Sequence, residues 1–205
     1  MKLYSVISMV ILLLLGAGCT NANNQVATIT ANPNSTYETT FKDLGIGVLY
    51  DFNFYLPDAD KRWVRMWVER YRDGQKDPQP LTQISYGLSP KKVKEGHLGF
   101  GIINPDNEHS SIFLYAPGVS QKPKKIKQSI NTNLPRSGGY AIGDGKVELE
   151  LGKTNILAVY RRASEKGSIK LYDFQKENEL EQMIKNDKTV LLLKLKTEKR
   201  EEVSG

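Results

Sequence analysis

The sequence predicts a mainly β domain: an antiparallel β-sandwich, immunoglobulin-like in general architecture, with one short helix before the last strand. Three observations support this fold class. Short segments alternate apolar and polar residues with a period of two, the pattern of strands that bury one face. Clusters of Gly, Pro, Asn and Asp separate these segments at short intervals. One segment near the C-terminus instead spaces its apolar residues as a helix does.

About nine strands are expected from these alternating segments. The clearest is KVELELG at 146–152, in which Val147, Leu149 and Leu151 would point inward. The turn pairs Asp73-Gly74 and Pro117-Gly118 are typical of the links between such strands. The other expected strands lie at 62–72, 82–88, 97–103, 110–116, 155–162, 168–174 and 189–196.

The segment RWVRMWVERYR at 62–72 is compatible with two structures. As a helix, it would start after Asp58 and end at Gly74. As a strand, it would place Val64 and its apolar neighbours on one face and the aromatic residues on the other. Its aromatic and β-branched residues favour the strand.

The segment KENELEQMIKND at 176–187 predicts the helix. Leu180, Met183 and Ile184 fall on one side at i, i+3 and i+4, and acidic residues occupy the first turn. We expect this helix to pack across an end or edge of the sandwich before the final strand.

The N-terminus carries a short apolar run, Val6–Leu15, followed by Gly16-Ala-Gly-Cys19. The run is about half of what a membrane-spanning helix needs, and it suits the apolar core of a signal peptide. The pattern resembles the lipobox of bacterial lipoproteins, although Gly16 stands where that family usually has Leu. The resemblance implies a signal peptide at 1–18 and a diacylated Cys19. The alternative is an ordinary cleaved signal with an incidental thiol.

Cys19 is the only cysteine of the 205 residues, so neither a disulfide nor a thiolate metal site is expected. The stretch after Cys19 is rich in Asn and Thr and nearly uncharged, which predicts a flexible tether over 19–40. The remaining 41–198 is long enough for one β-sandwich domain with a real core. The residues 199–205 are expected to form a solvated tail.

Candidate ligand-binding residues come from the second face of the expected strand at 62–72. An aromatic face with polar neighbours can bind sugars, peptides or cations by stacking and cation–π contact. The alternative is that both faces are buried and that Arg65 pairs with Glu69. The candidates are Trp63, Arg65, Trp67 and Tyr71.

Two lysine-rich loops are candidates for contact with an anionic surface. Net charge is +6, and headgroups or phosphate-bearing wall polymers would attract such loops. If both loops lie at one end of the sandwich, they form a single basic patch. Their members are Lys91, Lys92, Lys94, Lys122, Lys124, Lys125 and Lys127.

Catalytic and metal motifs are weak. His97 and His109 are the only histidines, which excludes three-histidine zinc sites, and both are expected to be exposed loop residues. Ser110 and Ser111 lack a G-x-S-x-G context. The segments Asp58-Ala-Asp60 and 104–107 look superficially like calcium loops but are better explained as turns. Neither a cofactor nor a metal is expected.

The leading functional hypothesis is a lipid-anchored, extracytoplasmic binding or interaction module of the bacterial cell envelope, without catalysis. Its expected partners are the membrane through the lipid anchor, anionic headgroups or wall polymers, and another envelope protein; nucleic acid is not expected. One alternative is a small envelope hydrolase that uses carboxylates, for which Asp58, Asp60 and Glu69 are the candidates. Another is a structural accessory subunit of an envelope protein complex.

Overall fold

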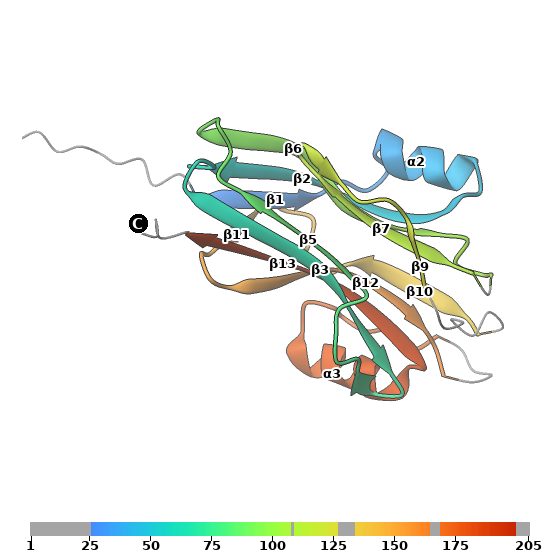
Figure 1. The fold of residues 1–205 in the computed structure, drawn as a ribbon. Helices are drawn as coiled ribbons and strands as arrows, with labels where there is room; N and C mark the ends of the chain where they lie inside the picture. Colours follow the sequence, from blue (N-terminus) through green and yellow to red (C-terminus); the bar gives the residue numbers. More distant parts are fainter. Residues whose placement is uncertain (1–25, 108, 127–133, 165–168, 200–205) are drawn as a thin grey trace, which may run out of the picture.

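The structure is a computed structural model that describes residues 26–107, 109–126, 134–164 and 169–199 (Figure 1). Its elements, in chain order, are β1 (Ala27–Ala31), α2 (Thr36–Asp43), β2 (Gly47–Pro57), β3 (Arg62–Arg72), β4 (Gln75–Lys76), β5 (Thr82–Gly87), β6 (Val93–Ile103), β7 (Ser111–Ala116), β8 (Val119–Ser120), β9 (Lys124–Lys125), β10 (Arg136–Tyr140), β11 (Val147–Leu149), β12 (Thr154–Arg162), α3 (Glu177–Asn186) and β13 (Thr189–Lys199).

The strands form two antiparallel sheets, which confirms the predicted β-sandwich. Sheet A has seven strands in the order β11-β1-β2-β6-β7-β8, with β9 also paired to β7. Sheet B has six in the order β10-β12-β13-β3-β4, with β5 also paired to β3. The main core lies between the sheets, and the two helices lie on the opposite outer faces, α2 over sheet A and α3 over sheet B (Figure 1).

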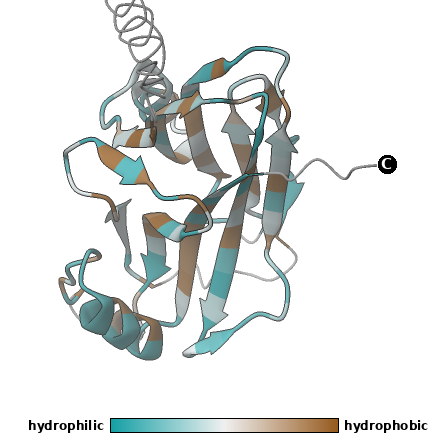
Figure 2. Cartoon of the chain, turned by 90° about the vertical axis from the view of Figure 1, so that its left-hand side faces the viewer, coloured by the Kyte–Doolittle hydropathy of each residue, from teal (hydrophilic) through white to brown (hydrophobic). Residues whose placement is uncertain are grey.

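Alternation along the strands decides which residues enter this core (Figure 2). The segment 62–72 is a strand, as its composition favoured, and its residues Val64, Met66 and Val68 are fully buried between the sheets. The strand pairs with β13 along its whole length, from Arg62 opposite Lys199 to Arg72 opposite Thr189. Its other face therefore points away from the core.

The predicted helix is present as α3, and it packs on the outer face of sheet B. Leu180 and Met183 are buried in a second apolar cluster with Val190 and Leu192 of β13. The strand expected at 168–174 is wrong: the described residues 169–173 form neither strand nor helix. Tyr172 and Phe174 from this stretch pack against the same cluster, so tertiary contacts rather than sheet pairing use their apolar surface.

The flexible tether expected over 19–40 is wrong for its described part. β1 is paired on both sides, to β11 and to β2, and its Ala27 and Ile29 are fully buried. α2 begins after Ser35, whose hydroxyl accepts a hydrogen bond from the backbone N–H of Glu38 at 3.2 Å, as a helix cap does. The described sandwich therefore includes the residues 27–40 that were expected to lie outside the domain.

Three predictions fall outside the described residues: the signal peptide at 1–18, the lipidated Cys19, and the tail beyond Lys199, which itself is the last residue of β13. Over the part of the chain that the structure describes, no helix has the length and apolar character needed to cross a membrane.

Candidate functional site

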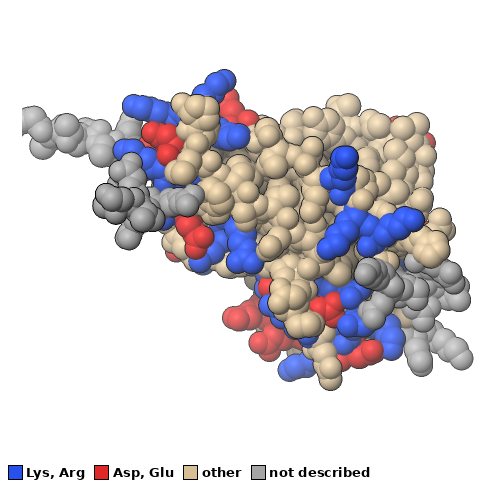
Figure 3. Space-filling model, in the orientation of Figure 1, with Lys and Arg blue, Asp and Glu red and all other residues tan. Residues whose placement is uncertain are grey.

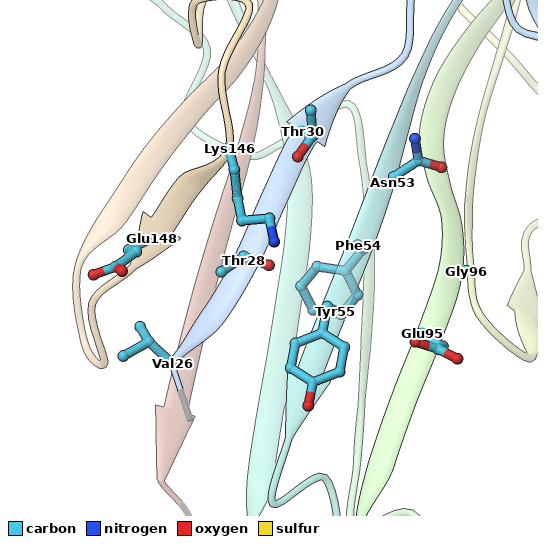
Figure 4. Close-up of a pocket in the computed structure, with 10 residues that line it drawn as sticks. All are labelled: Val26, Thr28, Thr30, Asn53, Phe54, Tyr55, Glu95, Gly96, Lys146 and Glu148. Carbon is cyan, nitrogen blue, oxygen red and sulfur yellow. The ribbon is translucent and has the colours of Figure 1, made fainter. Parts of the chain in front are cut away.

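The outer face of sheet A carries an open hollow of about 820 Å³ (Figure 4). Four neighbouring strands build it, in the order β11, β1, β2 and β6. The side chains that alternate outward along these strands line its surface, while the buried Phe54 contributes from the floor. The lining residues are Val26, Thr28, Thr30, Asn53, Phe54, Tyr55, Glu95, Gly96, Lys146 and Glu148.

The lining mixes apolar surface with polar groups that can form hydrogen bonds. It offers two hydroxyls from β1, the amide of Asn53, the phenol of Tyr55, and three charged groups: Glu95 of β6, Glu148 of β11 and Lys146 just before β11. Lys146, the residue just before β11, extends over β1 toward Thr28, whereas Glu148 and Glu95 stand at the two sides (Figure 4). The hollow thus combines hydrogen-bonding groups with two aromatic rings, Tyr55 at its surface and Phe54 in its floor, held on paired strands.

A buried carboxylate, Asp51, lies beside this hollow on the outer face of β2. The side chain of Asp51 is fully buried and has three side-chain partners. The phenol of Tyr115 donates to Oδ1 at 2.7 Å, the amide of Asn32 donates to Oδ2 at 2.9 Å, and Nδ1 of His97 lies 2.8 Å from Oδ2. A buried carboxylate is stable only when it is paired in this way.

His97 joins the Asp51 cluster to the hollow. It is a strand residue of β6 with a side chain 43% exposed, so the prediction of a loop histidine is wrong. The antiparallel register sets it directly opposite Asn53, which lines the hollow. Its ring also packs against Tyr37 of α2, with ring centroids 4.7 Å apart. His109, in contrast, is an exposed turn residue, as predicted.

Two tyrosines hydrogen-bonded to Asp51, Tyr115 and Tyr140, stay protonated. Burial and the nearby Asp51 carboxylate both raise the pKa of Tyr115, so its phenol remains a donor to Asp51. Burial also raises the pKa of Tyr140, whose phenol accepts from the backbone N–H of Asp51 and donates to the carboxylate of Glu38. The hydrogen bonds therefore link β2 to α2, which holds Glu38, and to sheet B, which holds Tyr140.

Two glycines of β6 make room for an aromatic cluster between α2 and sheet A. A Cβ at Gly99 would collide with Tyr115, and one at Gly101 would collide with Phe113. The rings of these two β7 residues consequently lie across β6 and meet the helix, where Phe113 and Phe41 have ring centroids 5.7 Å apart. The cluster borders a second, apolar hollow of about 350 Å³, which Tyr37, Thr40, Phe41, Leu49, Phe113 and Tyr115 line.

The predicted aromatic face of β3 is close-packed. Trp67 is only 8% exposed, and its indole N–H donates to Oε1 of Glu69 at 3.0 Å. Arg65 is exposed and lies over the Trp67 ring, 5.1 Å from its centroid, while Tyr71 donates to Glu69. Trp63 is half-buried. The structure thus places the four predicted residues on one face but brings no pair of exposed indoles together there.

Glu69, the charged centre of this face, pairs with two lysines rather than with Arg65. Its carboxylate lies 2.7 Å from Nζ of Lys76 and 2.8 Å from Nζ of Lys194. Burial alone would raise the pKa of Glu69, but the hydrogen bonds from Lys194, Lys76 and Trp67 outweigh it and lower the pKa from 4.5 to about 2. The carboxylate therefore contributes stability above its unfolded pKa, and this contribution is lost as pH falls from about 4.5 towards 2.

We expect Glu69→Gln to lower the free energy of unfolding by about 1–2 kcal/mol at pH 7, because it removes the charge but keeps the shape. The difference in stability between the variant and wild type should shrink as pH falls below about 4.5. There, unfolding of wild type is accompanied by protonation of Glu69, so wild type loses the contribution that the variant lacks. Urea unfolding at pH 7, 4 and 3 measures both effects. Glu198→Gln, on the neighbouring strand β13 at the same outer face of sheet B but 40% exposed, is the control and should differ little at any pH. A loss of stability in Glu69→Gln that is equal at all three pH values would contradict the lowered pKa of Glu69.

The two lysine loops do not form a single patch. Lys94 is the second residue of β6. Lys125 lies opposite Ser111 of β7, and Ser111 lies opposite Ile103, the last residue of β6. Lys94 and Ile103 are nine positions apart along β6, which places the two lysine loops roughly 30 Å apart. The condition for a single basic patch, that both loops lie at one end of the sandwich, is therefore not met, and Figure 3 shows basic side chains in separate groups with uncharged surface between them. Lys127 lies outside the described residues.

Several lysines of these loops have intramolecular contacts. Lys94 lies over the ring of Tyr86, 5.4 Å from its centroid, and Lys124 donates to the backbone carbonyl of Leu81 at 3.2 Å. Lys91 and Lys92 are exposed in the turn that precedes β6. The exposed lysines of the two loops thus face solvent at different ends of the sandwich.

The carboxylates suggested for hydrolysis are not brought together. Asp58 and Asp60 lie in the turn before β3, and Asp58 pairs with Arg62 at 3.2 Å. Glu69 lies seven residues beyond Arg62 along β3, which is roughly 23 Å. Among the described residues, no group of three or more His, Cys, Asp or Glu side chains is placed to hold a metal ion. Ser110 is buried and donates to the carbonyls of Asn104 and Asn107, which makes it part of a turn.

No family model, no curated protein and no solved structure matches this chain.

Proposed function

We propose that this chain is a non-catalytic binding module of the bacterial cell envelope, held at the outer face of a membrane by a lipid on Cys19, and that it binds its ligand in the hollow of sheet A. The observation that carries the binding function is the hollow itself: four paired strands present hydroxyl, amide, phenol and charged groups in one open concavity. The lipobox resemblance of the sequence up to Cys19 supports the location.

A binding role suits the hollow better than catalysis. A carboxylate-based hydrolase needs two carboxyl groups at a set separation around the bond to be broken. The carboxylates of the hollow, Glu95 and Glu148, come from β6 and β11, which are separated by β1 and β2 in the sheet. At about 4.8 Å per strand, three strand spacings set their backbones roughly 14 Å apart. Asp51 is satisfied by its three partners, and it stabilises the wall of the hollow rather than facing a ligand.

A second candidate function, that of an accessory subunit with a protein partner, is supported by the aromatic cluster. The apolar hollow beside α2 is lined by four aromatic rings, and Tyr37 and Leu44 of the same region are 48% and 69% exposed. Aromatic residues in an exposed apolar hollow are typical of protein-interaction surfaces. This surface adjoins the hollow of sheet A at His97 and Tyr37.

The lipid anchor is tested by expression of the full chain in a bacterial host that is fed radiolabelled palmitate. We expect the wild-type chain to carry the label and to sediment with the membranes. Cys19→Ser removes the thiol that accepts the lipid, so it should lose the label and leave the membrane fraction. Thr20→Ser, a change at the neighbouring position, should keep both properties. A wild-type chain without the label would overturn the proposal of a lipid anchor on Cys19.

The binding function is tested by cosedimentation of the purified full chain with washed, delipidated bacterial envelope material. We expect the protein to pellet with this material and to remain bound in about 0.5 M salt, because hydrogen bonding in the hollow is much less screened than surface charge. A wild-type chain that stays in the supernatant at every salt concentration would overturn the binding function.

A further inference from the structure

We propose that the ligand of the sheet A hollow is a neutral saccharide chain that lies across β11, β1, β2 and β6. This inference rests on the proposed binding function and names the chemical class of the ligand. Three features of the hollow support it: the groups in the lining, the net charge of the hollow, and the full pairing of the central strands beneath it.

The lining matches a ligand made of hydroxyl groups. A hydroxyl both donates and accepts, so a saccharide needs both kinds of partner. Thr28, Thr30 and Asn53 each offer a donor and an acceptor, Lys146 donates, and the two glutamates accept. The ring of Tyr55 adds an apolar surface with a polar tip, which suits the mixed faces of a sugar ring. An apolar lipid chain would leave most of these groups without partners.

The charge of the hollow differs in sign from that of the chain. The whole chain carries +6, yet the lining holds the carboxylates of Glu95 and Glu148 against the single ammonium of Lys146, a net charge of −1. Anionic headgroups, wall polymers and nucleic acid phosphates would be repelled by the excess carboxylate. A neutral saccharide is compatible with this charge, and its hydroxyls can donate to both glutamates.

The backbone under the hollow disfavours an extended peptide. Peptides that bind sheets usually add a strand at a free edge and use its unpaired N–H and C=O groups. β1 is paired to β11 and β2, and β2 is paired to β1 and β6, so the middle of the hollow is a sheet face and not an edge. Recognition there must come from side chains. Side chains on paired strands are held in place before the ligand arrives, which lowers the entropic cost of binding.

The experiment is isothermal titration calorimetry of the full chain in detergent with defined probes: tetrasaccharides of β-1,4-linked glucose and of β-1,4-linked N-acetylglucosamine. Tryptophan fluorescence is recorded in parallel, since both tryptophans lie on β3 of sheet B. We expect at least one probe to bind with little change in tryptophan emission. Absence of binding by both probes would overturn the inference, as would binding with a large emission change, which would place the ligand on sheet B.

Two hollow variants and one control locate the site. Asn53→Ala and Tyr55→Ala should each weaken binding of the probe by about tenfold, because each removes a hydrogen-bonding or stacking partner. Asn53 is exposed and should fold normally after truncation, so Asn53→Ala alone suffices if Tyr55→Ala unfolds. Arg65→Ala, exposed on the outer face of sheet B, is the control and should bind as wild type. An Asn53→Ala variant that binds the probe with unchanged affinity would overturn the location of the site in the hollow.

Cosedimentation separates a failure of this inference from a failure of the proposed function. If wild type and Asn53→Ala pellet equally with envelope material while both saccharide probes fail, the protein is a binding module whose ligand is not a neutral saccharide in this hollow. If wild type does not pellet at all, the proposed binding function itself fails.

Discussion

Asp51→Ala should lower the free energy of unfolding by about 3–5 kcal/mol, which would make Asp51 one of the most sensitive positions of the chain. The carboxylate is fully buried and accepts from Tyr115 and Asn32 while it pairs with His97. Its removal leaves the phenol of Tyr115 and the amide of Asn32, which are both half-buried, without their partner. Each lost hydrogen bond to a charged group costs about 1.5–3 kcal/mol.

Urea unfolding and thermal melting measure this loss, and a domain of this size should melt about 2–4 °C lower per kcal/mol. Asn53→Ala, two residues further along the same face of β2 and exposed, is the matched control and should stay within about 0.5 kcal/mol of wild type. Hydrogen exchange should also accelerate in β1 and α2, because Asn32 lies in the link between them. An Asp51→Ala chain within about 1 kcal/mol of wild type would show that the cluster does not stabilise the fold.

Arg161→Ala should cost a similar amount, about 3–5 kcal/mol, because it leaves a buried carboxylate unpaired. Arg161 is 1% exposed, and its guanidinium lies 2.7 Å from Oδ2 of Asp187. It also donates to the carbonyl of Lys170 and lies over the ring of Tyr172, 5.0 Å from the centroid. These contacts connect β12 to the segment before α3 and to the residue that ends the helix, so we expect α3 to detach first.

The pH dependence of this variant has a defined sign. Burial raises the pKa of Asp187 even though the hydrogen bond and charge of Arg161 lower it. Without Arg161, the folded state holds a proton on Asp187 that the unfolded state releases, so the loss of stability should be smallest at low pH and should grow as pH rises through the folded pKa.

A double-mutant cycle tests the pair itself. Arg161→Ala/Asp187→Ala should be less destabilised than the sum of the two single variants, because neither partner is left buried and alone. Arg65→Ala on the same sheet is the control and should cost less than about 1 kcal/mol, since it loses only an exposed contact with Trp67. Strict additivity of the two single variants would contradict a direct interaction between Arg161 and Asp187.

The fold class was predictable because alternation is a local property. In β3 the buried residues Val64, Met66 and Val68 follow the period of two, and in α3 Leu180 and Met183 follow the helical spacing. The errors occurred where the pattern is short or interrupted. β1 alternates over only five residues, and it lies in a stretch rich in Asn and Thr and nearly free of charge, which suggested a tether. Ser35 and Glu38 do form the start signal of a helix, and this signal could have revealed α2.

The candidate site was not predictable, because it depends on pairing between distant segments. His97 meets Asp51 across 46 residues of sequence, and the register of β2 with β6 alone decides that contact. The glycines at 99 and 101 looked like ordinary members of an apolar strand, although they set where the rings of Tyr115 and Phe113 lie. The hollow likewise joins β11 to β6, whose lining residues Glu148 and Glu95 are 53 positions apart in the chain, so its lining has no sequence signature.

The position of β1 has a mechanical consequence for a chain anchored at its N-terminus. If Cys19 is lipid-bound, only seven residues separate it from Ala27, the first residue of β1, and a pull from the membrane enters the fold along β1. The hydrogen bonds of β1 to β11 and β2 run perpendicular to that pull. Such bonds share the load and must break together, whereas bonds that are peeled from an end break singly. The domain would therefore resist traction at the end where the anchor applies it.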